Sequence, residues 1–448
     1  MSAFKSYDIR GVFGSDLTLD LVYRVGRCLP QLLTAKKFLV GRDARLSSPA
    51  VCEALLRGLT EAGADVDDMG LATTPMVYFF TAEKQYEGSV QITASHNPAH
   101  YNGLKVSKTE ALPVGYDAGL KTVEAWLAAG TLPPKAEQIG TVRTVHFLEE
   151  YCAWLLKHKP DLSSLRFAVD CSDGMGALVA KALFGEQAIY LNDVPDGTFP
   201  HHAPNPLEVA NCAQLIACVK SNHLDVGVIF DGDADRVMFV DHTGCFIQPD
   251  YLIPLIAERL SVPSEPRPIT VIHDIRTSRG VIERLHEEGF KTYMGKVGHA
   301  YAKIALRQYG ALCGGELAGH YYFRDFHFCD SGEWAALVVL GIVAEAKRRG
   351  ESFAEQLDPI RSRYVNSGEI NRTGVTDREA AIARVEQALV AQLGAPESRA
   401  DFDGVRLDWA NGWMSVRASN TEPVLRLLAE ARTQAQLTTM LAIAQAAV

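Results

Sequence analysis

The sequence has no long apolar segment. The longest uncharged apolar run that we find extends from Trp334 to Ala344, which is much shorter than the roughly 20 residues of a membrane-spanning helix. Charged residues such as Lys5, Asp8 and Arg10 interrupt the start of the chain, where a signal peptide would have an apolar core. We therefore expect a protein that contacts no membrane and resides in the cytoplasm.

Paired cysteines and runs of one charge are also missing. The nine cysteines are scattered without a CxxC motif, which is typical of reduced core thiols in a chain of 448 residues. Lys and Arg total 44 against 54 Asp and Glu, so the net charge is −10. Such a field repels polyphosphate backbones, which predicts no nucleic-acid partner. An anionic ligand would need local basic groups.

Three stretches repeat one pattern, in which an apolar run leads through an Asp-containing turn into a helical run. The three turns are Gly41 to Arg45, Asp170 to Gly174 and Asp274 to Ser278. After the first turn, Ser48 and Pro49 predict a helix N-cap followed by proline at N1. Each turn precedes a second apolar strand that ends in a polar loop; these loops contain Ser95, Asp231 and Glu316. Three such α/β units would suit one shared cleft.

The last part of the chain differs from these units. A capping box at Thr376 to Glu379 predicts a helix that stops at Gly394, and strand-like runs and a final helix follow. We therefore predict an α/β protein with three similar α/β domains containing mixed sheets, plus a C-terminal α+β domain, around a central cleft. The predicted domains are residues 1–143, 144–249, 250–361 and 362–448.

The segment Asp-Gly-Asp-Ala-Asp-Arg at residues 231–236 offers the strongest chemical signal. Asp231, Asp233 and Asp235 alternate along a loop between two apolar runs, and Gly232 allows that loop to turn tightly. Three carboxylates placed in this way can converge on one hard divalent cation, which we favour over a solvated acidic turn.

An EF-hand calcium loop is the competing metal site. Counting from Asp231, position 6 should be Gly but is Arg236, and position 12 should be Glu but is His242. Three carboxylates also leave coordination positions that a phosphate oxygen or water can fill, as Mg²⁺ prefers. The loop therefore predicts a Mg²⁺ site that awaits an anion.

Other polar segments are ambiguous by themselves. Ser95 follows a strand and can act as a nucleophile, but GxSxG is absent, and His96, as its immediate neighbour, would usually point elsewhere. Glu316 lies among glycines and suits either sugar hydroxyls or a surface turn. The segment from Arg417 to Pro423 suits a phosphate cradle or a polar hairpin turn. Lone residues such as Lys105 and His299 are more often structural.

Five motifs taken together are specific. They are Tyr-Asp-Ile-Arg-Gly at residues 7–11, Thr-Ala-Ser-His-Asn-Pro at 93–98, Asp-Gly-Asp-Ala-Asp-Arg at 231–236, Gly-Glu-x-x-Gly-His at 315–320 and Arg-x-Ser-Asn-Thr-Glu-Pro at 417–423. In this order the sequence resembles the α-D-phosphohexomutases, and most closely their bacterial phosphomannomutase/phosphoglucomutase branch. The resemblance covers essentially the whole chain and implies the same three-plus-one domain organisation.

The resemblance also implies roles for single residues. Ser95 matches the phosphoserine that gives and takes the phosphoryl group, and it would complete a metal site with Asp231, Asp233 and Asp235. The further residues implied for catalysis are Arg10, His96, Lys105, Arg236 and His299. The residues implied for substrate binding are Arg276, Glu316, His320, Arg417, Ser419, Asn420 and Thr421. None of these is assigned as the general base.

The implied activity is reversible transfer of phosphate between O1 and O6 of a hexose, with mannose or glucose 1- or 6-phosphate as substrate. The implied cofactors are Mg²⁺ and glucose or mannose 1,6-bisphosphate, and a monomer is favoured. At one position the chain departs from the branch, because Ala318 stands where a serine is common. The sugar preference therefore stays open, with phosphoglucosamine mutase as an alternative. A non-catalytic protein that binds sugar phosphate or metal, and a phosphatase, are further alternatives.

Overall fold

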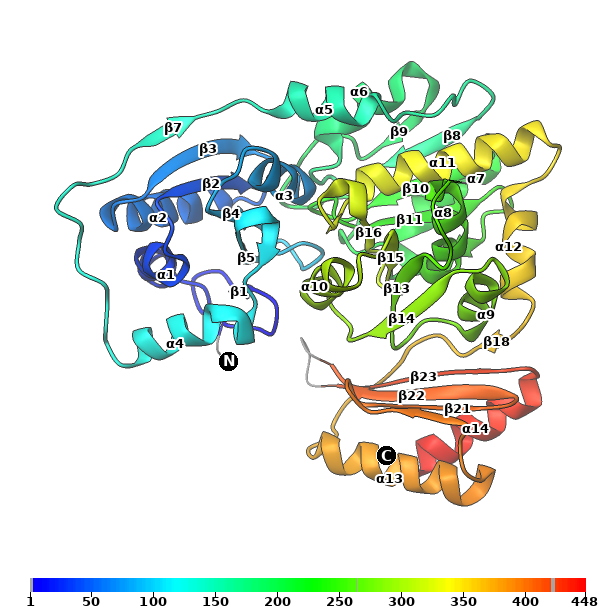
Figure 1. Ribbon diagram of the computed structural model, residues 1–448. Helices are drawn as coiled ribbons and strands as arrows, with labels where there is room; N and C mark the ends of the chain where they lie inside the picture. Colours follow the sequence, from blue (N-terminus) through cyan, green and yellow to red (C-terminus); the bar gives the residue numbers. More distant parts are fainter. Residues whose placement is uncertain (1–2, 263, 420–423) are drawn as a thin grey trace. The chain divides into compact units, whose positions relative to one another are not determined.

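The computed structural model describes residues 3–262, 264–419 and 424–448. The chain divides into two compact units (Figure 1): one comprises Met1–Gln248 and Ala318–Phe353, and the other comprises Pro249–Leu317 and Ala354–Val448. Within the described residues, no helix has the length and apolar character needed to cross a membrane. None of the nine cysteines forms a disulfide, and most of them are buried.

The first sheet of the first unit is mixed, in the order β1-β5-β4-β2-β3-β7, with β6 paired to β5. Strands β4, β2, β3 and β7 run parallel, whereas β1 and β4 pair antiparallel with β5. The strands are β1 (Ile9–Val12), β2 (Lys37–Arg42), β3 (Asp65–Leu71), β4 (Gly88–Ile92), β5 (Tyr101–Lys108), β6 (Leu112–Pro113) and β7 (Val142–Thr144), and the helices are α1 (Leu19–Leu33), α2 (Ser48–Glu61), α3 (Thr74–Glu83) and α4 (Lys121–Ala128).

Helices α1 and α2 approach each other closely because glycines face one another. A Cβ atom at Gly58 would lie 2.3 Å from the carbonyl oxygen of Tyr23, and one at Gly26 would lie 2.8 Å from that of Leu55. Buried apolar residues of both helices then form one core with the sheet. This packing fixes the sheet that carries the Ser95 loop.

The second sheet of the same unit has the order β12-β11-β10-β8-β9. Strand β10 is buried along its whole length, and it pairs parallel with β8 and antiparallel with β11. An apolar run without alternation is expected of a strand covered on both faces. The strands are β8 (Phe167–Asp170), β9 (Ile189–Leu191), β10 (Val226–Phe230), β11 (Val237–Asp241) and β12 (Phe246–Ile247), and the helices are α5 (Leu148–Leu156), α6 (Ala177–Phe184) and α7 (Ala213–Ser221). The unit also contains β16 (Tyr321–Phe323), β17 (Cys329–Asp330) and α11 (Gly332–Arg348).

The second unit begins with three parallel strands in the order β14-β13-β15. The elements of this part are α8 (Leu252–Leu260), β13 (Thr270–Asp274), α9 (Arg279–Glu287), β14 (Lys291–Gly295), α10 (His299–Tyr309), β15 (Cys313–Gly315) and α12 (Phe353–Arg361). The helical run expected after the turn from Asp274 to Ser278 is α9, so that prediction is confirmed.

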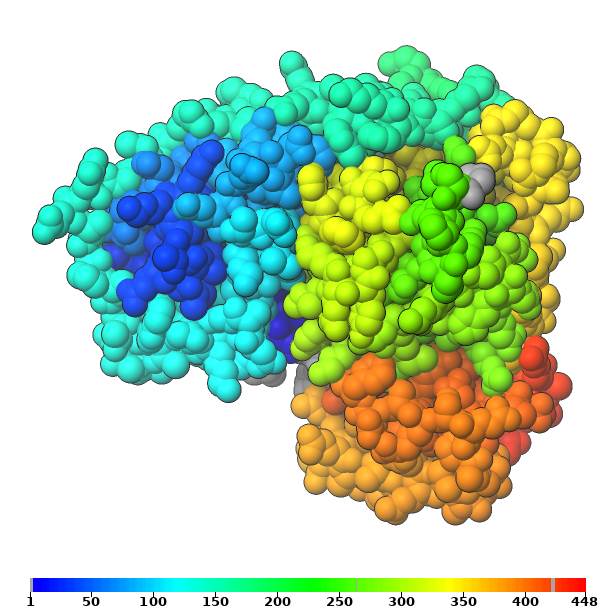
Figure 2. All heavy atoms as spheres, in the orientation of Figure 1, coloured from blue at the N-terminus to red at the C-terminus, as the bar shows by residue number. Residues whose placement is uncertain are grey.

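The C-terminal part of the second unit is an antiparallel sheet with two helices on one face (Figure 1). The elements are β18 (Val365–Asn366), β19 (Ile370–Arg372), α13 (Arg378–Leu393), β20 (Ser398–Ala400), β21 (Val405–Trp409), β22 (Gly412–Ala418), β23 (Leu425–Ala431) and α14 (Gln434–Ala447). Figure 2 shows the orange and red atoms of this segment as one continuous body, and apolar residues from sheet and helices form its core.

Two predicted helix caps are wrong by one residue. Ser48 is the first residue of α2 and not its N-cap, because its hydroxyl donates to Asp43 Oδ1 at 2.5 Å. Asp377, and not Thr376, caps α13 by accepting from the amide of Ala380. The predicted α/β class with mixed sheets and a last α+β domain is confirmed, whereas the domain boundaries and the shared cleft stay predictions.

Candidate active site

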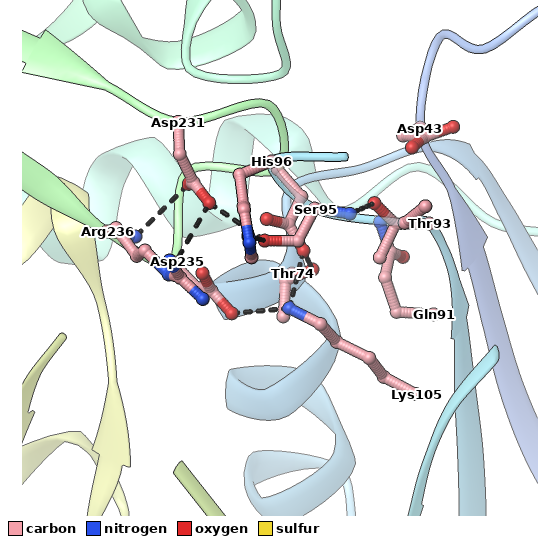
Figure 3. Close-up of polar contacts among 12 residues, drawn as sticks. Asp43, Thr74, Gln91, Thr93, Ser95, His96, Lys105, Asp231, Asp235 and Arg236 are labelled. Carbon is pink, nitrogen blue, oxygen red and sulfur yellow. Dashed lines mark hydrogen bonds and ion pairs between the residues drawn. The ribbon is translucent and has the colours of Figure 1, made fainter. Parts of the chain in front are cut away.

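Ser95 lies in the loop between β4 and β5, and only 1% of its surface is exposed to solvent. Its backbone is left-handed, with φ of 51°, which is uncommon for a residue with a side chain. The amide of Ser95 donates to Thr93 Oγ1 at 2.9 Å (Figure 3). The loop therefore holds this serine in one strained conformation, as functional sites often do.

The three aspartates of the sequence motif lie on the loop between β10 and β11, and all three are fully buried. One carboxylate oxygen from each of Asp231, Asp233 and Asp235 lies within 4.8 Å of the others. Gly232 permits close contact with the serine loop, since a Cβ atom there would lie 2.5 Å from the carbonyl oxygen of Ser95. The two loops meet within the first unit.

Lys105 on β5 supplies positive charge to these carboxylates. Its ammonium group donates to Asp233 Oδ2 at 2.7 Å and to Asp235 Oδ2 at 2.5 Å. Burial lowers the pKa of Lys105, but Asp233 and Asp235 outweigh burial, and the net shift is upward. The lysine therefore stays charged and offsets the negative charge of the loop that carries the three aspartates, which we call the acidic loop.

The carboxyl groups of the acidic loop differ in the direction of their pKa shifts. Burial, together with the charges of Asp233 and Asp235, raises the pKa of Asp231 well above its ordinary value. Burial also acts to raise the pKa of Asp235, but Lys105 and His320 outweigh it and the net shift is downward. The cations present thus compensate Asp235 better than Asp231.

The residues present fit a divalent cation. Asp233 Oδ1 and Asp235 Oδ1 are buried and accept no hydrogen bond from any described residue. Carboxylate oxygens are the ligands that Mg²⁺ prefers, and a cation would offset both the burial and the repulsion that raise the pKa of Asp231. The donor set therefore suits Mg²⁺.

Two arginines border the serine and the carboxylates. Arg10 on β1 donates to Asn97 Oδ1 at 2.8 Å and forms an ion pair with Asp8. The amide of Arg236 donates to Asp231 Oδ1 at 3.3 Å, and Arg236 Nε lies 3.8 Å from Asp231 Oδ2. Both guanidinium groups can attract a phosphate.

His320 joins Arg236 to a carboxylate that sequence reasoning missed. Arg236 Nε donates to His320 Nε2 at 2.9 Å. His320 Nδ1 lies 2.8 Å from Asp330 Oδ2. In this structure His320 thus contacts Arg236 and Asp330, while its predicted part in substrate binding stays a prediction.

His96 contacts the neighbouring serine, contrary to the expectation that it would point elsewhere. Its Nδ1 lies 3.2 Å from Ser95 Oγ (Figure 3). Burial and the charges of Arg236, Arg10 and Lys105 hold the pKa of His96 well below its ordinary value. The ring is therefore neutral near pH 7 and can form hydrogen bonds with the serine oxygen without adding charge.

The second unit gathers another set of the predicted residues. The buried Arg276 donates to Asp274 Oδ2 at 2.7 Å, and the same oxygen accepts from the amide of Leu317 at 3.3 Å. Burial lowers the pKa of Arg276, but Asp274 and Glu369 outweigh burial and raise it. Asp274 therefore links the arginine to the Glu316 loop.

Glu316 and Arg417 reach the same loop cluster. Glu316 Oε1 accepts from the amide of Gly298, which precedes His299 at the start of α10. Asp403 accepts from the amide of Val297 at 2.9 Å and pairs with Arg417 at 3.5 Å. Asp274 and Asp403 thus link Arg276 and Arg417 to the loops that carry Glu316 and His299. Ser419 follows β22, and Asn420 and Thr421 lie outside the described residues.

Sequence reasoning missed further residues of the site in the first unit. Thr74, at the start of α3, donates to Asp233 Oδ2 at 2.5 Å, and its amide donates to the carbonyl of Asp233. Arg45 contacts the carbonyl of Ser95. No sequence motif contains Thr74 or Asp330. Arg45 belongs to the first Asp-containing turn, but the sequence assigned it no function.

A serine facing three buried carboxylates, on loops of mixed α/β sheets, defines this as a site for phosphate and metal chemistry. The chain belongs to the phosphoglucomutase/phosphomannomutase family. Four models described as phosphoglucomutase/phosphomannomutase match it: alpha/beta/alpha domain I at residues 1–131, domain II at 147–244, domain III at 248–362 and the C-terminal domain at 370–444.

Individual relatives agree with this assignment. The chain is 37% identical to a Xanthomonas campestris pv. campestris protein named "Phosphohexose mutases", over 98% of this chain and 96% of that one. It is 34% identical to a Pseudomonas aeruginosa phosphomannomutase/phosphoglucomutase, over 97% of this chain and 93% of that one. A solved structure of a phosphoglucomutase/phosphomannomutase family protein from Burkholderia thailandensis superposes with a TM-score of 0.88 at 28% identity, covering 99% and 96% of the two chains.

Proposed function

We propose that the protein is a phosphomannomutase/phosphoglucomutase that moves phosphate between O1 and O6 of a hexose through a phosphoserine at Ser95 and a 1,6-bisphosphate. Relatives at 34–37% identity over nearly the full length carry phosphohexose mutase and phosphomannomutase names, which supports this activity. The observation that carries the proposal for this chain is the hydrogen bond of 2.9 Å from Ser95 Oγ to Asp231.

In the proposed first transfer, a hydroxyl oxygen of the hexose monophosphate attacks the phosphorus on Ser95. The bond between phosphorus and Ser95 Oγ breaks, and the attacking hydroxyl gives up its proton to a base. The bisphosphate then turns end for end. Ser95 Oγ gives up its proton and attacks the other phosphorus, the bond between that phosphorus and its sugar oxygen breaks, and the released oxygen takes up a proton to give the isomeric monophosphate. Phosphate is therefore neither gained nor lost in a cycle.

The residues near Ser95 suit such a transfer, which depends on positioning and on charge stabilisation. Lys105, Arg10 and Arg236 supply cations near the serine, and His96 supplies a neutral ring nitrogen. Asp231 accepts a hydrogen bond from the unmodified serine, which orients Oγ toward the three carboxylates. Bound to Asp231, Asp233 and Asp235, Mg²⁺ would supply positive charge to the transferring phosphoryl group.

The second unit supplies the proposed substrate contacts. Arg417 and Ser419, with Asn420 and Thr421 of the same motif, would grip the phosphate that does not react. Arg276, Glu316 and His299 would contact the sugar or its phosphate. An arginine and hydroxyl grip recognises phosphate without reading the ring, so it suits a bisphosphate that binds in either orientation.

The sugar is the open part of this proposal. Ala318 lacks the hydroxyl that is common in this branch, and one lost hydrogen bond changes affinity by about 0.5–1.5 kcal/mol. A glucosamine phosphate therefore remains the alternative substrate.

A phosphorus NMR panel tests the function. Purified protein receives Mg²⁺, a trace of glucose 1,6-bisphosphate, and in turn mannose, glucose and glucosamine 1-phosphate. Growth of the mannose or glucose 6-phosphate signal supports the proposal, and conversion of glucosamine phosphate alone supports the alternative. Absence of conversion in all three samples overturns both, and release of inorganic phosphate in excess of isomer identifies a phosphatase.

A further inference from the structure

Arg45 organises the backbone of the serine loop. Its side chain is fully buried, and its guanidinium group points its donors at the loop that follows β4. Nη1 and Nη2 donate to four carbonyl oxygens, those of Ser95 (2.8 Å), Asn97 (2.7 Å), Pro98 (2.6 Å) and Tyr101 (3.2 Å). Nε donates to Asp43 Oδ2 at 3.0 Å. All five N–H groups are thus engaged, and only arginine has this number of donors in one plane.

Asp43 holds the guanidinium group in place. One carboxylate oxygen accepts from Arg45 Nε, and the other accepts from the amide of Arg45 at 3.1 Å and from the hydroxyl of Ser48 at 2.5 Å. The buried charge is therefore paired, which a buried arginine requires. The amide of Asp43 donates to the carbonyl of Ile92, the last residue of β4. The pair is consequently anchored to the strand that leads into the serine loop.

The segment between β9 and α7 covers the other side of Arg45. The ring of Phe199 lies 5.0 Å from the guanidinium carbon. A Cβ atom at Gly197 would lie 2.2 Å from the carbonyl oxygen of Ala44, so the two segments are in close contact. Arg45 therefore has protein on both sides and little freedom to move.

We propose that Arg45 is a positioning residue for phosphoryl transfer, which fixes the left-handed backbone of Ser95 so that its Oγ faces Asp231. The inference rests on the proposed function and adds to it a residue that touches no substrate. Without these four hydrogen bonds, the loop carbonyls need other donors and Ser95 gains alternative positions. Displacement of a reacting atom by about 1 Å costs about a hundred-fold in rate.

The test compares Arg45→Lys with Arg27→Lys in the full-length protein. Arg27 on α1 is a matched control, because it is also buried and forms hydrogen bonds to Tyr23 and to the carbonyl of Pro133, but it does not contact the serine loop. We expect both variants to lose thermal stability. Only Arg45→Lys should lose about a hundred-fold in kcat, with KM changed less than about three-fold. Equal kcat values for the two variants, each corrected for its folded fraction, would overturn the proposal.

Two further measurements separate positioning from a merely structural role. Hydrogen exchange of peptides that cover residues 94–101 needs no substrate; it should be faster in Arg45→Lys and unchanged in Arg27→Lys. Unchanged exchange in the Arg45 variant would contradict the proposal even if the mutase activity itself were absent. Methylguanidinium should restore part of kcat to Arg45→Ala and none to Arg27→Ala, and failure of that rescue would count equally against it.

Discussion

Ser95 and Asp231 are separated by 136 positions in the chain, yet the serine hydroxyl donates to Asp231 Oδ2 at 2.9 Å. The serine follows β4 of the first sheet, and the aspartate follows β10 of the second. Both loops come after strands that are buried along their whole length, so each is held by a rigid scaffold. The proposed nucleophile and the proposed metal ligands therefore come from two sheets of one compact unit.

Ser95→Ala should abolish the mutase reaction. The variant lacks the oxygen that carries the phosphoryl group, so we expect kcat to fall at least about a thousand-fold. Intact-mass measurement should show the added phosphoryl group on the wild-type chain and none on the variant. Ser89→Ala is the control, because Ser89 is a buried serine on β4 whose hydroxyl accepts from Thr81 Oγ1 instead of facing the acidic loop. Unchanged turnover in Ser95→Ala would exclude a phosphoserine at this position.

Local patterns predicted the acidic loop and the α/β class with a last α+β domain, whereas long-range contacts escaped sequence reasoning. Alternating aspartates between two apolar runs predict a ligand-bearing loop because both signals lie within a few residues. Thr74 and Asp233 are 159 positions apart, so nothing near Thr74 announces their hydrogen bond. Ser48 is not the N-cap for a local reason, since its hydroxyl donates to Asp43, five positions earlier in the same turn.

Thr74→Val should weaken Mg²⁺ binding without removing a predicted metal ligand. The threonine hydroxyl orients the carboxylate of Asp233, and loss of such a supporting contact lowers metal affinity about 10–100-fold. The measurement is the Mg²⁺ concentration for half-maximal activity, together with calorimetry of Mg²⁺ binding. Thr60→Val is the control, because the Thr60 hydroxyl bonds the carbonyl of Leu56 within α2. An equal Mg²⁺ requirement in both variants would show that Thr74 does not support a metal ligand.

Gly232→Ala should disturb the contact between the two loops. The added Cβ atom would lie 2.5 Å from the carbonyl oxygen of Ser95, which is backbone and cannot rotate away. We expect a loss of stability of about 1–3 kcal/mol, the usual cost of overpacking, together with reduced kcat. Gly295→Ala is the control, since its Cβ atom would meet only ordinary contacts at 3.7 Å and beyond. Chemical denaturation followed by fluorescence measures the stability of both variants. Equal stability of Gly232→Ala and Gly295→Ala would contradict the close approach of the two loops.

Glu333 is a buried carboxyl group near the acidic loop that the proposed reaction does not use. It lies at the start of α11, fully buried, and its Oε2 accepts from the hydroxyl of Ser331 at 3.0 Å. Burial raises the pKa of Glu333 to about 8, and the hydrogen bonds from Thr73 and Ser331 offset only part of that rise. The folded protein therefore carries this group protonated at neutral pH.

Glu333→Gln should change how stability depends on pH. With a pKa of about 8 in the folded chain and 4.5 as the ordinary value, the folded state binds the extra proton between these limits. The stability that the wild-type carboxyl contributes is fully present below pH 4.5 and is lost as the pH rises through 8. Glutamine does not titrate. The free energy of unfolding of the variant therefore rises relative to that of wild type by a few kcal/mol as the pH increases over that range. Urea denaturation at half-unit pH intervals measures the difference; a difference independent of pH would mean that Glu333 is already ionised in the folded protein.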